Sequence, residues 1–365
     1  MSFEKVGFIG LGLIGGSIAK TIKKKYPDTT LIATARHADT IQEAHNFGTI
    51  ENDTLLPLSD FADCDYIFLC TPVQQNLIYL KELKSVIKPS CIITDVGSVK
   101  SDIHKAVTAL DMEANFIGGH PMCGSEKTGF FNATEYLLEN AYYIITPTAK
   151  TTPAQLEEFH ALVKSLGSVP MILDYEKHDF ATAAISHLPH IIASSLVNLV
   201  SDLDDEQETM RTIAAGGFKD ITRIASSSPV MWQNICLSNQ EQILKLTDCY
   251  IHALQNIRSS VADAKSDDII SFFQSAKDYR DSITTPVRGS LQKNYSVYCD
   301  LVDEAGAIAT LATIMASHNI SIKNIGILHN REYEDGVLQI EFYEEDALEK
   351  AVKLMEDNHY VMHRR

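Results

Sequence analysis

The stretch GLGLIGGS, residues 10–17, decides the fold of the first part of the chain. It follows the apolar run KVGFI and opens into the helical pattern SIAKTIKKK. Gly10, Gly12 and Gly15 have the G-x-G-x-x-G spacing, in which the first glycine permits a tight turn, the second lets the backbone approach a pyrophosphate, and the third lets helix and strand pack closely. The phosphates of a dinucleotide would then lie on the positive N-terminus of the helix.

The sequence on either side of this loop continues the same pattern. Over the first 175 residues, short apolar or β-branched runs alternate with helical patterns; the runs are KVGFIG, TLIATA, DYIFLCTP, SCIITDVG, NFIGGH, AYYIITP and VPMIL. Several of them are apolar throughout, which suits strands covered on both faces. We therefore predict an α/β fold, a Rossmann-type doubly wound parallel sheet that binds a dinucleotide, over residues 1–173.

The pattern of apolar residues changes twice in the rest of the chain. From Asp174 to about Pro286 strand signals almost vanish and apolar residues recur at helical spacing, which predicts an all-helical domain over residues 174–290. After the polar connector TTPVRGSLQKN, residues 295–365 read as strand, helix, two strands, helix and strand. That order predicts a small ferredoxin-like domain.

Length and charge narrow the class of protein. A chain of 365 residues is too long for one compact core, and a net charge of −17 argues against nucleic acid and anionic membranes as partners. Seven cysteines without C-x-x-C spacing indicate reduced thiols. No apolar run approaches the roughly 18 residues of a membrane helix, and the start lacks the features of a signal peptide, so we expect a cytoplasmic protein.

The end of the second predicted strand bears on the choice of coenzyme. A carboxylate that would bind the ribose 2′-hydroxyl is missing there, since Ala35 occupies its position and Arg36 and His37 follow. An arginine at this point suits a 2′-phosphate, which makes NADP as well as NAD a candidate coenzyme. The alternative, that Arg36 is only a solvated loop residue, stays open.

Two polar residues follow neighbouring apolar strands. Ser98 lies in TDVGSVK and His120 follows NFIGG, so both should reach the carboxyl edge of the sheet, where ligands bind in such folds. A histidine there can accept a proton near neutral pH. Taken alone, His120 could equally be an ordinary loop histidine.

Further motifs favour the catalytic interpretation. The segment SHLPH carries Ser186, His187 and His190, and GGFKDITRIASSSPVMW carries Asp220 and Arg223 and ends at Trp232, the single tryptophan. The set GLGLIGGS, GSVK, HPMCGSEKTG, SHLPH and GGFKDITRIASSSPVMW, in this order, resembles the prephenate dehydrogenase family of tyrosine biosynthesis over roughly residues 3 to 290. The tail from about residue 296 resembles an ACT domain, a regulatory module of amino-acid biosynthetic enzymes.

The resemblance implies a reaction and a role for each motif. A cyclohexadienyl hydroxy dicarboxylate, prephenate, would pass its C4 hydride to NAD or NADP and lose carbon dioxide. His120 would accept the C4 hydroxyl proton and Ser98 would orient it, while His190 and Arg223 would bind the substrate carboxylates. The remaining residues expected at the substrate are Ser186, Glu126, Asp220 and Trp232. The residues expected at the coenzyme are Gly10, Gly12, Leu13, Ile14, Gly15, Arg36, Thr71, Pro72 and Ser98.

The tail implies regulation. By resemblance, such domains pair across subunits of a homodimer and bind an amino acid near the turn at Gly306, with Asn324 as a contact. L-tyrosine, the end product, is the expected effector. The family commonly has proline before that glycine, whereas this chain has Ala305. A purely structural dimerisation unit is the alternative.

Three other functions stay open at this point. An arogenate dehydrogenase would differ only in an amino group on the substrate side chain. A non-catalytic amino-acid sensor would use the ACT domain alone. A metal hydrolase would use His187 and His190, which lie three residues apart and could share a helix face as metal ligands. No cysteine or carboxylate completes such a site, so we expect no metal.

Overall fold

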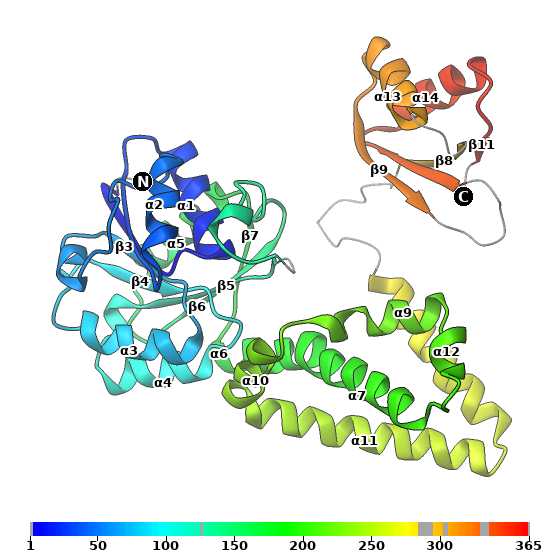
Figure 1. The fold of residues 1–365 in the computed structure, drawn as a ribbon, viewed down its shortest axis with the longest axis horizontal. Helices are drawn as coiled ribbons and strands as arrows, with labels where there is room; N and C mark the ends of the chain where they lie inside the picture. The colour runs from blue at the N-terminus through cyan, green and yellow to red at the C-terminus, as the bar shows by residue number, and fades with distance from the viewer. Residues whose placement is uncertain (1–2, 125–126, 284–294, 302–305, 329–335, 364–365) are drawn as a thin grey trace. The chain divides into compact units, whose positions relative to one another are not determined.

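The computed structural model of the chain describes residues 3–124, 127–283, 295–301, 306–328 and 336–363. It contains two compact units, Met1–Lys265 and Ser266–Arg365 (Figure 1). The first unit holds a sheet with its covering helices, followed by a helical region. The second holds one helix and a small sheet domain. The three domain boundaries expected from the sequence stay a prediction.

The strands of the first unit form one twisted layer. They are β1 (Lys5–Ile9), β2 (Thr30–Thr34), β3 (Tyr66–Leu69), β4 (Ile92–Asp95), β5 (Ile117–Pro121), β6 (Tyr142–Pro147) and β7 (Val169–Ile172). Parallel pairing gives the order β2-β1-β3-β4, and a parallel bridge between Ile93 and Phe116 continues it toward the order β5-β6-β7. The predicted Rossmann-type sheet is confirmed.

One strand pair departs from the predicted parallel arrangement. β5 and β6 are antiparallel, with His120 opposite Ile144, while β6 and β7 are parallel. The connection between β5 and β6 contains only the short 3-10 helix η3 (Phe130–Asn132) among its described residues, rather than a crossover helix. Parallel neighbours require such a crossover, so the chain returns beside β5 in the opposite direction.

Helices cover both faces of this sheet, as the apolar strands predicted. They are α1 (Leu13–Lys25), α2 (Ala38–Asn46), α3 (Val73–Leu83), α4 (Ser101–Ala109) and α5 (Pro153–Ser165), with the 3-10 turns η1 (Leu58–Phe61) and η2 (Glu113–Asn115). In β1, Val6 and Phe8 join the core that includes Ile18 of α1. Ile9 joins the core on the other face, which includes Ile103 of α4.

A helical region follows the sheet in the first unit. Its elements are α6 (Tyr175–Thr182), the π-helix η4 (Ala183–His187), α7 (Leu188–Leu203), α8 (Thr209–Ile213), α9 (Gly216–Thr222), η5 (Arg223–Ser226), α10 (Pro229–Ser238) and α11 (Gln240–Ala262). The Asp174 carboxylate caps α6 by accepting the Lys177 N–H at 2.7 Å. The all-helical character predicted after residue 174 is therefore observed.

The helix formed by α6, η4 and α7 is more apolar than expected. Over Tyr175–Leu203, an 18-residue window reaches a mean hydropathy of 1.4, enough to cross a membrane by length and composition, and 17% of that window is buried. The expectation of no such segment counted only uninterrupted apolar runs. The first turns of this helix carry the buried polar residues His178 and Asp179 and pack on α4, which indicates attachment to the sheet rather than to lipid.

The second unit contains α12 (Ser266–Ile283) and a four-stranded sheet. The remaining elements are β8 (Tyr295–Leu301), α13 (Ala307–Ser317), β9 (Ile322–Leu328), β10 (Gly336–Phe342), α14 (Glu345–Asp357) and β11 (Met362–His363). The strands are antiparallel in the order β11-β8-β10-β9. Val297 and Ile340 of the sheet pack with Leu311 of α13 and Met355 of α14. This is the predicted ferredoxin-like arrangement.

Candidate active site

The glycine loop after β1 has the geometry of a dinucleotide site. Gly10 has a φ of +91°, and a Cβ at Gly15 would lie 2.6 Å from the Gly10 carbonyl oxygen, so neither position accepts a side chain without strain. A Cβ at Gly12 would meet no atom within 4 Å. Gly12 is also the N-cap of α1, whose first turn contains no acidic residue. The open space therefore faces a helix N-terminus that suits a pyrophosphate.

The other residues expected at the coenzyme follow the carboxyl ends of parallel strands. Leu13 and Ile14 begin α1, Thr71 and Pro72 lie between β3 and α3, and Ser98 follows β4. A Cβ at Gly10 would lie 2.7 Å from the Thr71 side chain, so the loops after β1 and β3 adjoin.

The loop after β2 carries the residues that bear on a 2′-phosphate. Arg36 is exposed, and its Nε donates to Nε2 of His37, the N-cap of α2, at 2.9 Å. The guanidinium is thus held at the surface beside the carboxyl end of β2.

His120 lies at the same edge and contacts a second histidine. It is the penultimate residue of β5 and is partly buried. Its Nδ1 lies 2.8 Å from Nε2 of His178 on α6, and Nδ1 of His178 lies 2.8 Å from a carboxylate oxygen of Asp179. His178 and Asp179 are fully buried. A chain of three polar side chains therefore runs from β5 into the helical region.

Lys100, from the GSVK motif, anchors the backbone behind His120. Its fully buried ammonium pairs with the Asp95 carboxylate and donates to the Gly119 carbonyl oxygen at 2.6 Å. The same carboxylate accepts the N–H of Gly97 at 2.9 Å. Burial lowers the pKa of Lys100, and the charge of Asp95 opposes that effect. These contacts join the end of β4 to the residue that precedes His120.

Asp179 joins the helical region of the first unit to the helix α4, which covers the sheet. Its two carboxylate oxygens accept the N–H groups of Lys100 at 2.8 Å and Ser101 at 2.7 Å, at the start of α4. The side chain of Asn239 donates to the Asp179 carbonyl oxygen at 2.9 Å. Burial alone would raise the pKa of Asp179, but the hydrogen bonds from His178, Ser101 and Lys100 bring it below its ordinary value. The carboxylate is therefore ionised at neutral pH.

The surroundings of His120 favour its neutral form. Removal from water holds the pKa of His120 well below 6.5, and positive charge on His178 and Lys100 would lower it further. Burial also lowers the pKa of the neighbouring His187 to about 4. An imidazole in this environment keeps a lone pair available at neutral pH, as a general base requires.

The two histidines of SHLPH have different surroundings. His187 is buried and lies 3.2 Å from the side-chain nitrogen of Asn239 through its Nδ1. His190 donates from Nδ1 to the Ser186 carbonyl oxygen at 2.9 Å, and its ring stacks on Trp232 with centroids 3.8 Å apart. Ser186 lies in η4. The structure thus brings His190, Ser186 and Trp232 together, as the sequence analysis expected.

The backbone of the DITR segment, residues 220–223, lies near His190, Ser186 and Trp232. Arg223 begins η5, which packs against α7, the helix that carries His190. Arg223 and Asp220 are exposed. Ile221 is 57% exposed, whereas Ile224 is partly buried. Glu126, expected beside Arg223, lies outside the described residues.

Sequence reasoning missed three residues of this site: Lys100, His178 and Asp179. Lys100 is part of the GSVK motif, in which only Ser98 drew attention. The adjacent His178 and Asp179 open the apolar helix after β7, and a polar pair at the start of such a helix was the available signal. Their partners are distant in the sequence, since His120 is 58 positions from His178.

Gly306 and Asn324, the two residues expected to contact an effector, both lie in the second unit. Gly306 has a φ of +95° and is the N-cap of α13, and a Cβ there would meet no atom within 4 Å. Asn324 in β9 is exposed and accepts the N–H of Ile325 at 2.9 Å.

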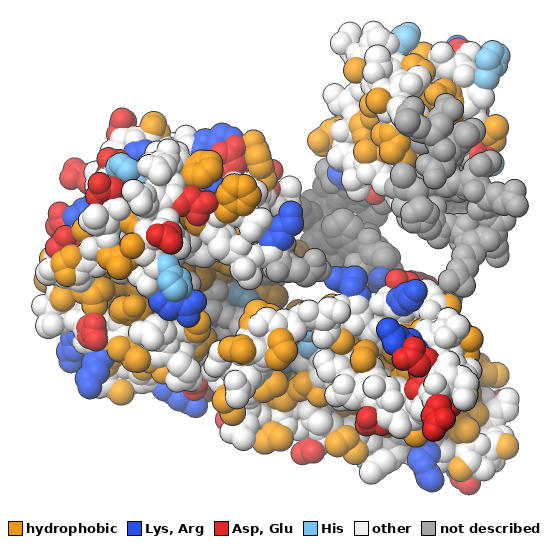
Figure 2. Space-filling model, in the orientation of Figure 1, with side chains coloured by type: hydrophobic (Ala, Val, Ile, Leu, Met, Phe, Trp, Pro, Cys, Tyr) orange, Lys and Arg blue, Asp and Glu red, His pale blue; other side chains and the backbone are white. Residues whose placement is uncertain are grey.

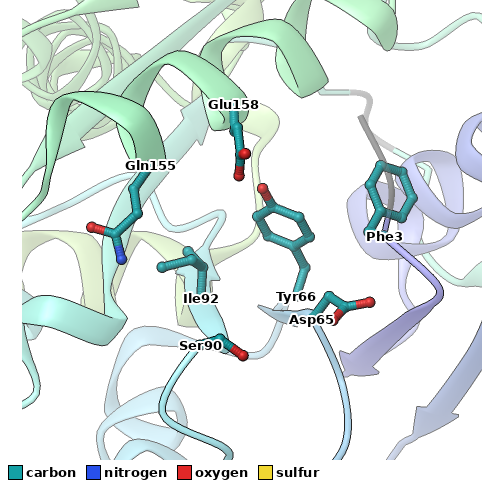
Figure 3. Close-up of a pocket in the computed structure, with 7 residues that line it drawn as sticks. All are labelled: Phe3, Asp65, Tyr66, Ser90, Ile92, Gln155 and Glu158. Carbon is teal, nitrogen blue, oxygen red and sulfur yellow. The ribbon is translucent and has the colours of Figure 1, made fainter.

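One cavity of about 170 Å³ lies at the opposite, amino edge of the sheet (Figure 3). Its lining residues are Phe3, Asp65, Tyr66, Ser90, Ile92, Gln155 and Glu158. Asp65 pairs with Lys88 at 2.6 Å and accepts the N–H of Glu4. Because Tyr66 and Ile92 begin their strands, this cavity is separate from the carboxyl edge of the sheet. Across the described parts of the chain, no group of three or more His, Cys, Asp or Glu side chains could hold a metal ion.

The chain matches two family descriptions. Residues 18–172 match the prephenate dehydrogenase nucleotide-binding domain, and residues 174–275 match the prephenate dehydrogenase dimerization domain. A prephenate dehydrogenase of Bacillus subtilis (strain 168) is 39% identical over 349 residues, which cover 95% of this chain and 94% of that protein.

Two solved structures share the fold. The crystal structure of prephenate dehydrogenase from A. aeolicus in complex with hydroxyphenyl propionate and NAD+ superposes with a TM-score of 0.73 at 28% identity, covering 78% of this chain and 99% of that one. Synechocystis arogenate dehydrogenase gives a TM-score of 0.70 at 30% identity, covering 77% of this chain and 100% of that one.

Proposed function

The chain belongs to the prephenate dehydrogenase family, and from that premise we propose that it converts prephenate to 4-hydroxyphenylpyruvate by oxidative decarboxylation, with hydride transfer to NAD or NADP. The observation that carries the proposal is the position of a neutral, partly buried base, His120, on the sheet edge that also presents the open Gly12 loop. Ligands of open α/β sheets bind at this edge.

The coenzyme site is supported by the fit of the loop residues. Gly10, Gly12 and Gly15, with Leu13 and Ile14, would hold the pyrophosphate at the N-terminus of α1. Thr71, Pro72 and Ser98 would border the nicotinamide, and Arg36 the ribose. When bound, the nicotinamide would accept the hydride from C4 of the substrate.

His120 would remove the proton of the C4 hydroxyl. Departure of the hydride leaves positive charge at C4, and removal of the hydroxyl proton converts that charge into a carbonyl. A positioned base of this kind contributes roughly 10²- to 10⁴-fold in rate. Ser98, after the neighbouring strand, would orient the hydroxyl. Loss of carbon dioxide then gives an aromatic ring, which makes the reaction effectively irreversible.

The helical region would bind the substrate carboxylates. Arg223 suits a carboxylate because its planar guanidinium donates two parallel hydrogen bonds, and His190 would contact the second one. Trp232 supports this assignment: its indole N–H is buried and finds no acceptor among the described residues. The other residues proposed to line or order this pocket are Ser186, Asp220 and Glu126.

We propose that the protein is a homodimer through its helical region. Large hydrophobic side chains are exposed along α7, α10 and α11; they include Leu199, Leu203, Leu237, Leu244, Leu254 and Val261. Figure 2 shows hydrophobic side chains spread over the visible face of these helices. Large exposed hydrophobic side chains gathered on one helical region favour a protein interface there. Burial against a second copy also accounts for the exposed apolar helix Tyr175–Leu203.

We also propose that the second unit senses L-tyrosine in the cytoplasm. Its ferredoxin-like sheet has the architecture of an ACT domain, and a Cβ at Gly306 would meet no atom within 4 Å. Asn324 would contact that ligand. The Bacillus subtilis relative is named a prephenate dehydrogenase, which supports a cytoplasmic enzyme without nucleic-acid or membrane partners.

A turnover assay tests these proposals together. Purified protein is given prephenate or arogenate with NAD or NADP, each with and without L-tyrosine, and reduced coenzyme is followed by absorbance. We expect turnover of prephenate and its inhibition by tyrosine. A preference for arogenate would reassign the substrate, as the similarity to the Synechocystis enzyme allows. No turnover of either substrate, together with tyrosine binding, would favour the non-catalytic sensor.

A further inference from the structure

The buried chain His120–His178–Asp179 determines where protons lie before any reaction begins. Asp179 is ionised and can only accept hydrogen bonds, so the proton between it and His178 belongs to Nδ1 of His178. A neutral His178 then has a lone pair on Nε2. That lone pair would accept the Nδ1–H of His120, whose Nδ1 lies 2.8 Å away.

This arrangement leaves one atom of His120 free. With its proton on Nδ1, the ring presents the lone pair of Nε2. The Lys100 contact to the Gly119 carbonyl holds the backbone that precedes the ring. The opposite tautomer would place a proton on Nε2, and His120 could then accept nothing from a substrate.

We propose that His178 is a positioning residue and proton acceptor for His120, so that the charge created in the reaction comes to lie beside Asp179. The inference rests on the proposed function. As the substrate O–H bond breaks, a new N–H bond forms at Nε2 of His120. The Nδ1–H bond of His120 breaks in turn, and the proton bonds to Nε2 of His178. The imidazole pair thus gains the one proton that the substrate loses. The resulting positive charge is an imidazolium on His178, which faces the Asp179 carboxylate.

The local charges favour this destination. His120 lies near the buried ammonium of Lys100, which repels a positive charge on the imidazole. His178 instead contacts a carboxylate that is fully buried, where an attraction between charges is stronger than in water. Moving the positive charge from His120 to His178 therefore carries it away from Lys100 and toward Asp179.

Substitution of His178 tests the idea better than substitution of Asp179, which also accepts the N–H groups at the start of α4. In His178→Gln, the amide oxygen can accept the Nδ1–H of His120 but cannot take up its proton. In His178→Leu, neither is possible. His104→Gln is the matched control, because His104 is a buried histidine whose ring hydrogen-bonds Thr146 rather than a member of this chain.

The first measurement is ¹⁵N NMR of histidine-labelled protein without substrate, with His120 assigned through His120→Asn. We expect the Nδ1–H tautomer of His120 in the wild type and in His178→Gln, and a mixture of tautomers in His178→Leu. An Nε2–H tautomer in the wild type would overturn the inference. Because no substrate is present, this outcome is distinct from a failure to turn over prephenate, which would contradict the proposed function.

The second measurement is steady-state kinetics with a proton inventory in mixed H₂O and D₂O. We expect kcat to fall at least about tenfold in His178→Gln and further in His178→Leu, within the 10²- to 10⁴-fold that general-base assistance contributes. KM and NAD binding should stay within about twofold. The inventory should be curved in the wild type and in His104→Gln, and linear in His178→Gln. Wild-type kcat and curvature in His178→Gln would refute the transfer.

Discussion

At the scale of single residues, burial rather than an acidic partner keeps His120 ready to accept a proton. Its contact is another histidine, and the nearest ammonium, Lys100, repels added charge. A base in this environment is weak in the thermodynamic sense, yet it stays unprotonated over a wide pH range. The carboxylate that compensates the charge, Asp179, is one side chain further away.

Replacement of His120 by asparagine should remove the base but keep the shape of the site. We expect kcat to fall by about 10²- to 10⁴-fold, while the dissociation constant for NAD stays nearly unchanged. Steady-state assays measure kcat. Displacement of fluorescent NADH by NAD measures the dissociation constant for NAD. The pH profile of wild-type kcat/KM is the companion experiment: since the pKa of His120 lies well below 6.5, activity should persist through pH 6.5 and decline only at lower pH. Full activity of the variant would exclude His120 as the base.

Arg36 bears on coenzyme choice. If its guanidinium contacts a 2′-phosphate, Arg36→Ala should weaken NADPH binding by roughly tenfold, the value of about 1.4 kcal/mol for a charge-assisted contact, and leave NADH binding almost unchanged. Fluorescence titrations with both reduced coenzymes measure this. Equal effects on the two coenzymes would show that Arg36 does not read the 2′ position.

At the scale of elements, Gly12 and Gly15 at the start of α1 are required for different reasons. A Cβ at Gly15 would lie 2.6 Å from the Gly10 carbonyl oxygen and 2.9 Å from Cys70 Cβ, whereas one at Gly12 would enter open space. Gly15→Ala should therefore destabilise the fold by about 1–3 kcal/mol, as overpacking does. Gly12→Val should leave the melting temperature nearly unchanged and weaken NAD binding. Thermal melts and titrations of both variants separate the effects, and reversed outcomes would contradict the assigned geometry.

The packing of α4 on α6 makes the first unit sensitive to acid. His104 is buried, stacks on Tyr175 and has its pKa lowered to about 4, mainly by burial. Between about pH 6.5 and 4 the unfolded chain binds a proton at this histidine that the folded chain does not, so stability falls as the pH falls through that window. The free energy of unfolding should fall by on the order of 3 kcal/mol across that window. Urea unfolding of wild type and His104→Gln at pH 7 and pH 4.5 should show a smaller acid loss in the variant; equal losses would assign the sensitivity elsewhere.

At the scale of the whole molecule, the proposed homodimer explains why the helical region exposes more hydrophobic surface than a monomer should. Leu244 on α11 is 56% exposed, and Ile78 on α3, in the sheet unit, is 52% exposed. Leu244→Glu should shift the sedimentation coefficient at micromolar concentration toward the monomer, because it would bury an unpaired charge. Ile78→Glu is the matched control and should sediment as the wild type does. A monomeric wild type would refute the dimer.

The sequence by itself determined the order and type of most elements, the glycine loop and the ferredoxin-like tail, and it singled out His120 as the proposed base. These depend on local information, namely apolar periodicity, the spacing of Gly10, Gly12 and Gly15, and motifs read along one strand and one turn. Such signals lie within a few residues of each other, so one chain suffices to read them.

Only the tertiary structure decided how the base is held. His178 and Asp179 reach His120 because α6 packs on α4 and β5, and Lys100 is an anchor because its ammonium is enclosed between Asp95 and the Gly119 carbonyl. The antiparallel return of β6 beside β5 was likewise decided by packing. The physical reason is common to all three: each depends on contacts between segments far apart in the chain, and burial, which sets their protonation, does not exist until those segments meet.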